Sequence, residues 1–403
     1  MVNVAVLGYG TIGSGVVEVL QTNTEVIAQR AGEEIAVKYI LDLRDFPGDP
    51  NADKIVHDYD IIDKDEDVQV VVECMGGVEP AYTFVKRALL NGRSVATSNK
   101  ELVAKHGAEL IAIAHEKNIN FLFEASVGGG IPIIRPLVQC LTADVIEEVS
   151  GILNGTTNYM LTRMKEEGIS FEEALKEAQE KGYAELHPEA DVEGYDACRK
   201  IAILSSLMFS KNVDSEKVPT EGITKITAAD FEYANATDHT IKLLGRSRAI
   251  DDNTAEVMVA PFLLSKEHPL AMVHGVFNAV FVTGNMLGDS MYYGRGAGKL
   301  PTASAVVSDV VDCARHQGKV IMCFWDKEEV KLADIGEAER SFFIRAKAGA
   351  EDAVTAAFPG GRMVHLKDRK EDFGYFTQSM KEKDFQAKYE ALGGQMLGRI
   401  RLV

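Results

Sequence analysis

The sequence predicts an α/β protein that begins with a doubly wound parallel sheet, followed by an α+β region and a small ferredoxin-like module. Three observations lead to this fold class. Short apolar runs alternate with helical segments over residues 1–130, a glycine-rich turn follows the first run, and residues 340–403 change to the order βαββαβ. Strand–helix alternation is typical of a parallel sheet with helices on both faces.

The strands of the first region are expected to be buried, because their sequences are continuously apolar and do not alternate with polar residues. They cover residues 4–7, 36–43, 68–74, 94–97 and 120–124. Helices are predicted between them at residues 14–31, 80–90 and 102–117. This order predicts one doubly wound domain over residues 1–130.

A second region of mixed structure begins after the glycine-rich loop at residues 128–132, where the composition changes. Helices are predicted at residues 133–141, 157–166, 170–181, 196–209 and 302–314, and strands at residues 145–152, 256–263 and 278–283. The segment 196–209 is strongly apolar, which is typical of a buried helix. We assign residues 131–299 to an α+β domain.

The C-terminal residues 338–403 are the smallest predicted domain. Strands are expected at residues 340–348, 362–367, 375–379 and 396–403, and helices at residues 351–358 and 385–392. The resulting order is that of a ferredoxin-like module.

The composition excludes several classes of function. The 403 residues include 43 Lys and Arg against 61 Asp and Glu, which gives a formal net charge of −18. Sequence-independent nucleic-acid binding and polybasic membrane anchoring both need a basic surface, so no nucleic-acid or membrane partner is expected. No apolar run approaches the ~18 residues of a membrane span. Five scattered cysteines without a CxxC pair, and no visible secretory signal, predict a cytoplasmic protein with reduced thiols.

The turn after the first strand has the pattern GxGxxG at Gly8, Gly10 and Gly13. The first glycine permits a tight turn, the second lets the backbone approach a pyrophosphate, and the third allows close helix–strand packing. The N-terminus of the following helix, with Thr11 and Ile12, favours the charge of the phosphates. Because the motif lies in the first strand–helix unit, it predicts a Rossmann-type nucleotide-binding domain that holds NADP or NAD. A purely structural turn is the alternative.

The end of the second strand bears on the choice between the two cofactors. An acidic residue there binds the ribose 2′-hydroxyl of NAD, whereas an arginine accommodates the 2′-phosphate of NADP. This sequence has both, as Asp42 and Arg44. Arg44 is also consistent with a solvated surface charge, but the pattern favours NADP.

Two further strand ends bring polar residues to the edge where doubly wound sheets bind their ligands. Gly76 lies in ECMGGVEP after the third strand, and Ser98 and Lys100 lie in TSNK after the fourth. From there Lys100 can contact the nicotinamide ribose side and a substrate oxygen. The alternative for a lone lysine at a strand end is an exposed charge.

The most informative segment is GYAELHPEADVEGYDACRK, residues 182–200. Asp196 and Lys200 are four residues apart and therefore share one helix face. An exposed pair with this spacing contributes only roughly 0.3–0.5 kcal/mol. The apolar neighbours Ile201 and Leu204 instead predict a partly buried pair. A lysine in a low-dielectric cleft loses proton affinity and can exchange a proton with an alcohol.

Together, these segments resemble the homoserine dehydrogenase family over nearly all of residues 1–320. The resemblance includes GYGTIG, VVECMGGVEPA, SVATSNKELVAKHG, FEASVGGGIPIIRPL, GILNGTTNYMLTRM and GRGAGKLPTASAVVSDVVD. Several of these long motifs are specific to that family, whereas GxGxxG alone is widespread. The resemblance implies reversible reduction of L-aspartate 4-semialdehyde to L-homoserine with NADH or NADPH, a step of threonine and methionine biosynthesis.

The resemblance also implies roles in the substrate site. Glu185 would bind the α-ammonium group of the substrate with Asp191 nearby, and Asp196 and Lys200 would lie at its hydroxyl or aldehyde oxygen. Lys100 would lie on the other side, between nicotinamide and substrate. One of the two lysines would pass the proton while hydride moves to or from C4 of nicotinamide, and the sequence leaves open which one. A positive charge beside the aldehyde oxygen stabilises the developing alkoxide.

The loop EASVGGGI resembles the site at which the family binds a monovalent cation, Na⁺ or K⁺. Glu124 would supply a carboxylate, and Val127, Gly129 and Ile131 would supply backbone carbonyls. Oxygen ligands suit a hard cation. A glycine-rich hinge between domains is the alternative, and the loop can serve as both.

The resemblance extends to the cofactor and to the assembly. Gly182 would lie near the nicotinamide, and Gly298 would close over the cofactor from the far side. A helix within residues 300–320 would return to the nucleotide-binding domain and complete it. The middle domain would also form the contact between subunits, so a homodimer or homotetramer is expected.

One position departs from the family pattern, since His187 stands before Pro188 where Asp is usual. A tolerated loop substitution is one interpretation. The other is a changed pH profile or a less ordered loop, because histidine titrates near neutrality. The predicted activity is kept because the acidic residues around the loop and Lys200 remain.

The C-terminal module resembles an ACT domain, an amino-acid-sensing fold found in many biosynthetic enzymes. Feedback control by L-threonine is one hypothesis for residues 338–403, and a dimerisation element is the other. Two alternatives remain for the whole chain. Another NAD(P) oxidoreductase, such as an aspartate dehydrogenase, lacks the NGTTNY segment, and a catalytically altered amino-acid sensor is expected to lose Lys100, Asp196 or Lys200.

Overall fold

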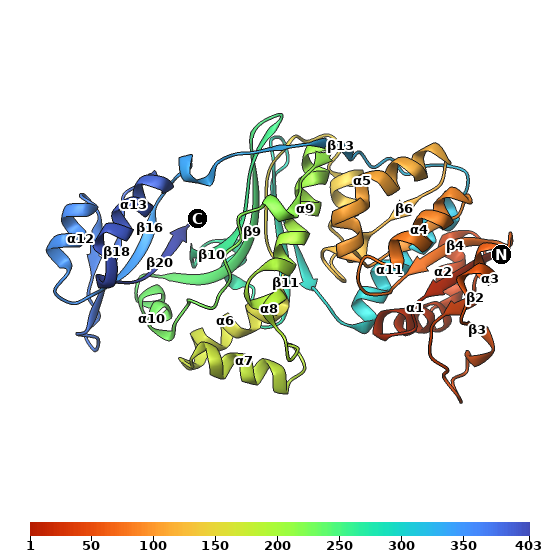
Figure 1. Cartoon of the computed structure of the whole chain (residues 1–403), viewed down its shortest axis with the longest axis horizontal. Coiled ribbons are helices and arrows are strands. Elements are labelled where there is room, and N and C mark those ends of the chain that lie inside the picture. Colours follow the sequence, from red (N-terminus) through yellow and green to blue (C-terminus); the bar gives the residue numbers. More distant parts are fainter.

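The computed structural model describes all residues, 1–403. A six-stranded sheet lies near the N-terminus, and a ten-stranded sheet runs from the middle region into the C-terminal one. Along the longest axis, the N-terminal sheet lies at one end and helices α12 (Glu351–Ala357) and α13 (Glu382–Leu392) lie at the other (Figure 1). Helix α9 (Tyr195–Phe209) lies between them. No helix has both the length and the apolar character that crossing a membrane requires.

The first sheet has the order β3-β2-β1-β4-β5-β6, and all of its neighbouring strands are parallel. Its strands are β1 (Val2–Leu7), β2 (Ile35–Leu41), β3 (Ile55–Val56), β4 (Val68–Glu73), β5 (Ser94–Thr97) and β6 (Phe121–Leu122). The chain reverses its direction across the sheet between β1 and β4, and ligands of doubly wound sheets bind at this switch point. The predicted Rossmann-type fold is confirmed.

The helices of this region are α1 (Thr11–Thr22), α2 (Thr24–Ala31), α3 (Tyr59–Asp63), α4 (Ala81–Leu90) and α5 (Lys100–Glu116). The prediction of one helix over residues 14–31 is wrong, because the chain leaves the helical conformation at Asn23 and starts again. Asn23 has φ and ψ angles of −108° and 24°. The predicted strand over residues 120–124 is also too long, since Glu124 lies in a short 3-10 turn.

Helix α11 (Lys299–Arg315) packs against the first sheet although nearly 180 residues separate it from β6. Ala303, Val306 and Val310 share a buried core with the side chains of β1. Gly15 on α1 makes room for this contact, because a Cβ there would lie 2.9 Å from the Cγ atom of Lys299. The last long helix therefore covers the same sheet as α1.

The second sheet has the order β12-β11-β7-β9-β10-β20-β16-β18-β17, with β14 paired to β10. Its middle strands are β7 (Ile146–Ile152), β9 (His239–Asp251), β10 (Thr254–Ser265), β11 (Phe277–Gly284), β12 (Gly288–Arg295) and β14 (Lys331–Leu332). The accompanying helices are α6 (Gly155–Glu167), α7 (Phe171–Glu180), α8 (Glu189–Val192) and α10 (Ala228–Ala236). Two small sheets pair β13 (Asp326–Glu329) with β8 (Lys211–Asn212) and β15 (Glu339–Arg340) with β19 (Met380–Lys381).

The predicted helix over residues 133–141 is present, but most of it is not α-helical. Ile134 and Arg135 are α-helical, and the chain continues as a π-helical turn over Pro136–Cys140. Pro136 lies in the first turn, where its missing N–H removes no hydrogen bond of the helix. Strands β9 and β12 were not predicted from the sequence.

The C-terminal strands are β16 (Phe342–Lys347), β17 (Arg362–Val364), β18 (Asp372–Phe376) and β20 (Met396–Leu402). With α12 and α13 they follow the order strand, helix, strand, strand, helix, strand. This region is not a separate sheet, because β20 pairs in parallel with β10, with Phe262 opposite Arg401. Phe342 packs under the two helices, whereas Phe343 enters the large core of the middle region. Both faces of β16 are therefore buried.

Candidate active site

The glycine turn between β1 and α1 leaves a cradle at the switch point. Gly8 has a φ angle of 91°, which favours glycine, and a Cβ on Gly13 would lie 1.8 Å from the carbonyl oxygen of Gly8. Gly10 is the N-cap residue of α1, and nothing lies within 4 Å of its Cβ position. The open space faces the helix N-terminus at Thr11 and Ile12, where backbone N–H groups can receive a phosphate.

Asp42 and Arg44 meet beside this turn. The Asp42 carboxylate accepts the N–H of Tyr9 at 2.8 Å and two hydrogen bonds from the Arg44 guanidinium at 3.0 Å. The hydrogen bonds from Arg44 hold the pKa of Asp42 well below its usual range. Arg44 is exposed. The two groups are therefore bonded to each other, and the Arg44 side chain is the one that is open to solvent, at 63% exposure against 9% for Asp42.

Glu73 links the ends of β4 and β5, and the sequence did not identify it as a functional residue. Its fully buried carboxylate accepts the Thr97 hydroxyl at 2.5 Å, the N–H of Met75 at 2.7 Å and the Asn99 amide at 3.5 Å. Burial raises the pKa of Glu73 to about 7, although these donors oppose the shift. An acid that ends an otherwise apolar strand is the signal that could have identified it.

Asn99 places the start of α5 at the same edge. Its side chain accepts the N–H of Leu102 at 3.1 Å and donates to the carbonyl of Gly77 at 2.7 Å. The N–H of Ser98 donates to the carbonyl of Glu73 at 3.3 Å. Lys100 is therefore the first residue of a capped helix, and the segment that carries Gly76 is joined to it.

Lys100 and Lys200 both contact Asp196, which joins the first sheet region to helix α9. The Nζ atom of Lys200 lies 2.8 Å from Asp196 Oδ2 and 2.8 Å from the carbonyl oxygen of Leu153. The Nζ atom of Lys100 donates to Asp196 Oδ1. Asp196 is 3% exposed and Lys200 8%, whereas the Lys100 side chain is 38% exposed. An exposed surface pair is excluded for Asp196 and Lys200.

The protonation of this cluster follows from burial and charge. Burial alone would raise the pKa of Asp196, but the charges of Lys200 and Lys100 hold it well below its usual range. Burial lowers the pKa of Lys200, and the Asp196 carboxylate only partly opposes this shift. The cluster therefore places a permanent carboxylate between two ammonium groups, one of which gives up its proton more readily than a free lysine.

Asn154 is a second residue that the sequence did not identify. Its Nδ2 atom donates to Asp191 Oδ1 at 2.7 Å and to Asp196 Oδ2 at 2.9 Å, while its Oδ1 atom accepts the N–H of Thr157 at 2.8 Å and so caps α6. Burial raises the pKa of Asp191, and the Asn154 amide opposes the shift. An asparagine directly before a predicted helix was the available signal.

Glu185 is not brought into this cluster. It lies in the exposed segment after α7, and its carboxylate takes part in no hydrogen bond or ion pair. Gly182 begins this segment with a φ angle of 72°. His187 is also exposed, with its Nδ1 atom 3.9 Å from the Glu189 carboxylate. Gly298 lies elsewhere, as the N-cap residue of α11 with a φ angle of 120°.

The Glu124 carboxylate caps the turn that follows its own loop. It accepts the N–H groups of Ile133, Ile134 and Arg135 at 2.6, 2.8 and 2.7 Å. No hydrogen bond of the structure ends on the carbonyl oxygens of Val127, Gly129 and Ile131, although all three residues are buried. Gly129 packs so closely on the loop before α11 that a Cβ would lie 2.3 Å from the carbonyl oxygen of Gly296.

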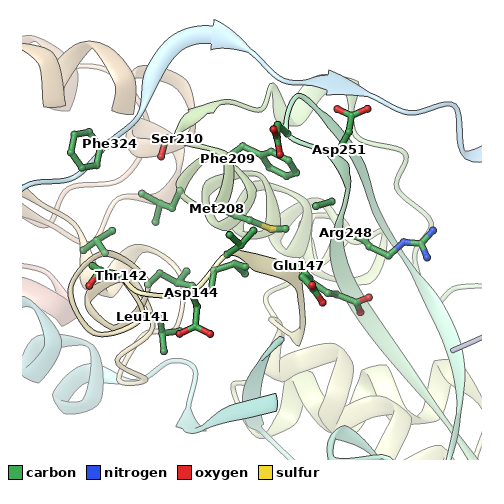
Figure 2. A pocket seen from close by; sticks show the side chains of 18 of the residues that line it. Leu141, Thr142, Asp144, Glu147, Met208, Phe209, Ser210, Arg248, Asp251 and Phe324 are labelled. Carbon is green, nitrogen blue, oxygen red and sulfur yellow. The ribbon is translucent and has the colours of Figure 1, made fainter. Parts of the chain in front are cut away.

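A cavity of about 810 Å³ lies elsewhere. Figure 2 shows its walls, with Met208 and Phe209 from the C-terminal end of α9 facing Leu141 and Glu147. Asp196 is at the opposite end of α9, and none of the predicted site residues lines this cavity. The chemistry of the lysine–aspartate cluster, and not cavity size, therefore locates the candidate site.

Two family models match the chain, and each includes part of this site. The homoserine dehydrogenase NAD-binding domain matches residues 8–124, and the homoserine dehydrogenase domain matches residues 132–311. The homoserine dehydrogenase of Bacillus subtilis is 45% identical over 317 residues, which are 77% of this chain and 72% of that one. That of Helicobacter pylori is 40% identical over 354 residues, which are 87% and 83% of the two chains.

Solved structures lead to the same family. The crystal structure of a homoserine dehydrogenase from Thiobacillus denitrificans has a TM-score of 0.90 and 35% identity, and covers 100% of this chain and 98% of that one. The structure of a hyperthermophilic archaeal homoserine dehydrogenase in complex with NADPH has a TM-score of 0.65 and 27% identity, and covers 77% of this chain and 97% of that one. The chain therefore belongs to the homoserine dehydrogenase family, the NAD(P)-dependent oxidoreductases that act on the CH–OH group of homoserine.

Proposed function

We propose that Lys100, Asp196 and Lys200 form the site at which L-aspartate 4-semialdehyde is reversibly reduced to L-homoserine. The observation that carries this proposal is one buried carboxylate shared by two lysines, one from the first sheet region and one from α9. Such a cluster offers positive charge to an oxygen that becomes an alkoxide. All three side chains are present, which disfavours a sensor that has lost catalysis.

Lys200 is the proposed proton donor for reduction. Its lowered pKa makes it a better acid than a free lysine, and Asp196 and the Leu153 carbonyl hold its Nζ atom in place. When bound, the nicotinamide cofactor supplies the hydride. The carbonyl carbon then gains the C–H bond, its oxygen gains the proton from Lys200, and the neutral amine is protonated again from solvent. Lys100, which is partly exposed, keeps Asp196 ionised meanwhile.

The ammonium group of the amino-acid substrate is proposed to bind Asp191 and Glu185. Asp191 is supported by its contact with Asn154, which places it one amide group away from Asp196. The Glu185 carboxylate has no partner within the chain and is free to take one. The exposed segment that carries it, Gly182 included, would then close over the substrate and the nicotinamide.

NADP is the proposed preferred cofactor. The glycine cradle and the strand-end segments with Gly76 and Ser98 would hold its pyrophosphate and nicotinamide, and Gly298 would approach from α11. Arg44 supports the choice, because its guanidinium is exposed while Asp42, the residue that NAD would need, is already bonded to it.

A monovalent cation, Na⁺ or K⁺, is proposed in the loop from Glu124 to Ile131. The carbonyl oxygens of Val127, Gly129 and Ile131 support it, because buried carbonyls normally have a partner. Since Glu124 already binds three N–H groups, its carboxylate would contribute charge and keep its role as a cap. The same contacts make the loop a stiff junction between regions.

The division of the chain is proposed as residues 1–130 with helix 300–320, residues 131–299, and an ACT-like region over 338–403. The strand order β20-β16-β18-β17 of residues 338–403 supports a ferredoxin-like region. L-threonine is the proposed effector of this region. A homodimer or homotetramer is proposed through the middle region. The exposed apolar side chains of Met291 and Tyr293 on the edge strand β12 support this contact.

The direct test is to follow oxidation of NADPH and of NADH with L-aspartate 4-semialdehyde. We expect turnover with both cofactors and a lower KM for NADPH. If neither NADPH nor NADH were oxidised, the proposed reaction would be refuted. Repeating the assay with added L-threonine, K⁺ or Na⁺ tests the effector and the cation separately.

A further inference from the structure

An ion pair that no catalytic role requires joins the last strand, β20, to a turn at residues 219–223, and this turn packs against the segment that carries Asp191 and Asp196. We propose that Glu221 is a positioning residue, whose ion pair with Arg401 fixes the segment that carries Asp191 and Asp196. By this contact the C-terminal region sets the affinity for the amino-acid substrate. The inference rests on the proposed substrate site and concerns its regulation.

The pair has the geometry of a specific contact. Arg401 on β20 donates from Nη1 to Glu221 Oε2 at 2.9 Å and from Nη2 to Oε1 at 2.7 Å. Arg399, two residues earlier, reaches the same carboxylate at 3.3 Å. Arg401 is 2% exposed, and bidentate pairs of this kind are stronger and more directional than single bonds. Glu221 is therefore held by two residues of the last strand.

Arg401 does not need Glu221 in order to be buried. Its Nε atom also lies 3.0 Å from an oxygen of the buried Glu382 on α13, within the C-terminal region. Glu382 is shared with Arg340, which has a second carboxylate partner in Glu256 at 3.0 Å. The two buried arginines therefore have two buried carboxylates without Glu221, and Glu221 serves the contact between the two regions. Removing the Glu221 charge should accordingly leave the C-terminal fold intact.

Glu221 is rigidly connected to α8. Its own N–H donates to the carbonyl of Val259 at 2.8 Å, and the N–H of Ile223 donates to the carbonyl of Val192 at 2.8 Å. Between them, Gly222 lies so close to α8 that a Cβ would be 2.1 Å from the carbonyl oxygen of Val192. Only glycine fits this approach. A displacement of Glu221 is therefore passed to the end of α8.

The end of α8 determines where the carboxylates of Asp191 and Asp196 lie. Asp191 precedes Val192 directly, and Gly194, with a φ angle of 86°, connects α8 to α9 two residues before Asp196. Figure 1 shows α8 at the start of α9, with β20 beside β10 on the C-terminal side. The path from Arg401 to Asp196 thus consists of one ion pair, one tightly packed turn and one glycine link.

Phe343 and Ile400 join the two regions through the large apolar core, but the side of the turn that carries Glu221 faces a cavity. A cavity of about 690 Å³ separates the C-terminal region from the turn, and its lining is mostly polar, with Glu193, Thr224, Tyr389 and Arg399 among its residues. The backbone of the turn is bonded to β10, and the Glu221 carboxylate adds the ion pair that reaches β20 across this space. A ligand or modification that moves β20 would act on the substrate site by this route.

The test is the variant Glu221→Gln, which removes the charge with little change in shape. We expect the KM for L-homoserine to rise about threefold to tenfold, the range of energetic coupling through such networks. The kcat and the KM for NADP should change by less than about twofold, because neither the lysine cluster nor the glycine cradle is touched. A merely structural role would change all three together.

Glu337→Gln is the matched control. Glu337 is equally half-exposed, at 49% against 44% for Glu221, and it also pairs with the C-terminal region, through Lys381 at 2.9 Å and Lys383. Glu337 has no connection to α8, so the KM values of the Glu337→Gln variant should equal those of the parent. Equal KM values for L-homoserine in the two variants would overturn the inference.

Asp191→Asn separates this inference from the proposed substrate site. A raised KM for L-homoserine in Asp191→Asn with a normal value in Glu221→Gln overturns the inference alone. An unchanged KM in Asp191→Asn refutes the proposed role of Asp191 and the inference with it. Raised values in both variants support both statements.

Discussion

Replacing Lys200 by methionine removes one ammonium group from the active-site cluster and keeps a side chain of similar length. Asp196 loses the partner at 2.8 Å but keeps Lys100 and the Asn154 amide, so its charge remains paired. The Leu153 carbonyl loses its donor. The protein should therefore fold, with a lowered melting temperature, because a buried charge pair is only partly broken.

The loss of activity can be estimated from the two roles proposed for Lys200. A positioned donor at a developing oxyanion is worth about 2.7–4 kcal/mol, and a general acid contributes about 10²–10⁴-fold. These effects overlap, because one ammonium group supplies both. We expect kcat for reduction of L-aspartate 4-semialdehyde to fall by about 10³–10⁴-fold, equivalent to about 4–5.5 kcal/mol.

The assay is steady-state oxidation of NADPH, with NADPH affinity measured separately by fluorescence titration. The affinity for NADPH should stay within about twofold, since Lys200 lies on α9 and not at the glycine cradle. Removing a contact that is made only in the transition state lowers kcat without changing binding. Lys100→Met is the comparison, with a smaller loss expected. A Lys200→Met variant within about tenfold of the parent kcat would refute the assigned role, since a general acid alone contributes more.

Three further predictions concern Arg44, Glu73 and Glu124. Arg44→Ala should raise the KM for NADPH by about tenfold and leave that for NADH nearly unchanged, because only NADP carries the 2′-phosphate; equal changes for both cofactors would contradict the proposed preference. Glu73 has a pKa raised from its ordinary 4.5 to about 7 by burial, so the folded state holds the proton more tightly and the free energy of unfolding falls as pH rises from about 4.5 to 7. Glu73→Gln should remove this part of the pH dependence, which amounts to up to about 3 kcal/mol. The measurement is urea unfolding at several pH values. If the free energy of unfolding changed with pH in the variant as it does in the parent, Glu73 would not titrate in this range. Glu124→Ala leaves three N–H groups without their acceptor and should lower the free energy of unfolding by about 2–4 kcal/mol, and a melting temperature equal to that of the parent would argue against the cap.

Local patterns were sufficient for most of the first region. The glycine spacing, the continuous apolar runs and the helical periodicity are properties of short segments, and the strands and helices built from them appear where they were predicted. The errors also have local causes. Asn23 divides one predicted helix into two, because its backbone leaves the helical conformation.

The sequence by itself determined the fold class, the nucleotide-binding turn and the residue types of the cluster, because these depend on spacing within about one helix or strand. Tertiary structure alone decided which charges meet. Lys100 and Asp196 are 96 residues apart, and Glu221 and Arg401 are 180 apart. No periodicity connects such residues. Their contacts exist because α9 lies against the first sheet region and β20 pairs with β10, and burial then changes what each charge can do.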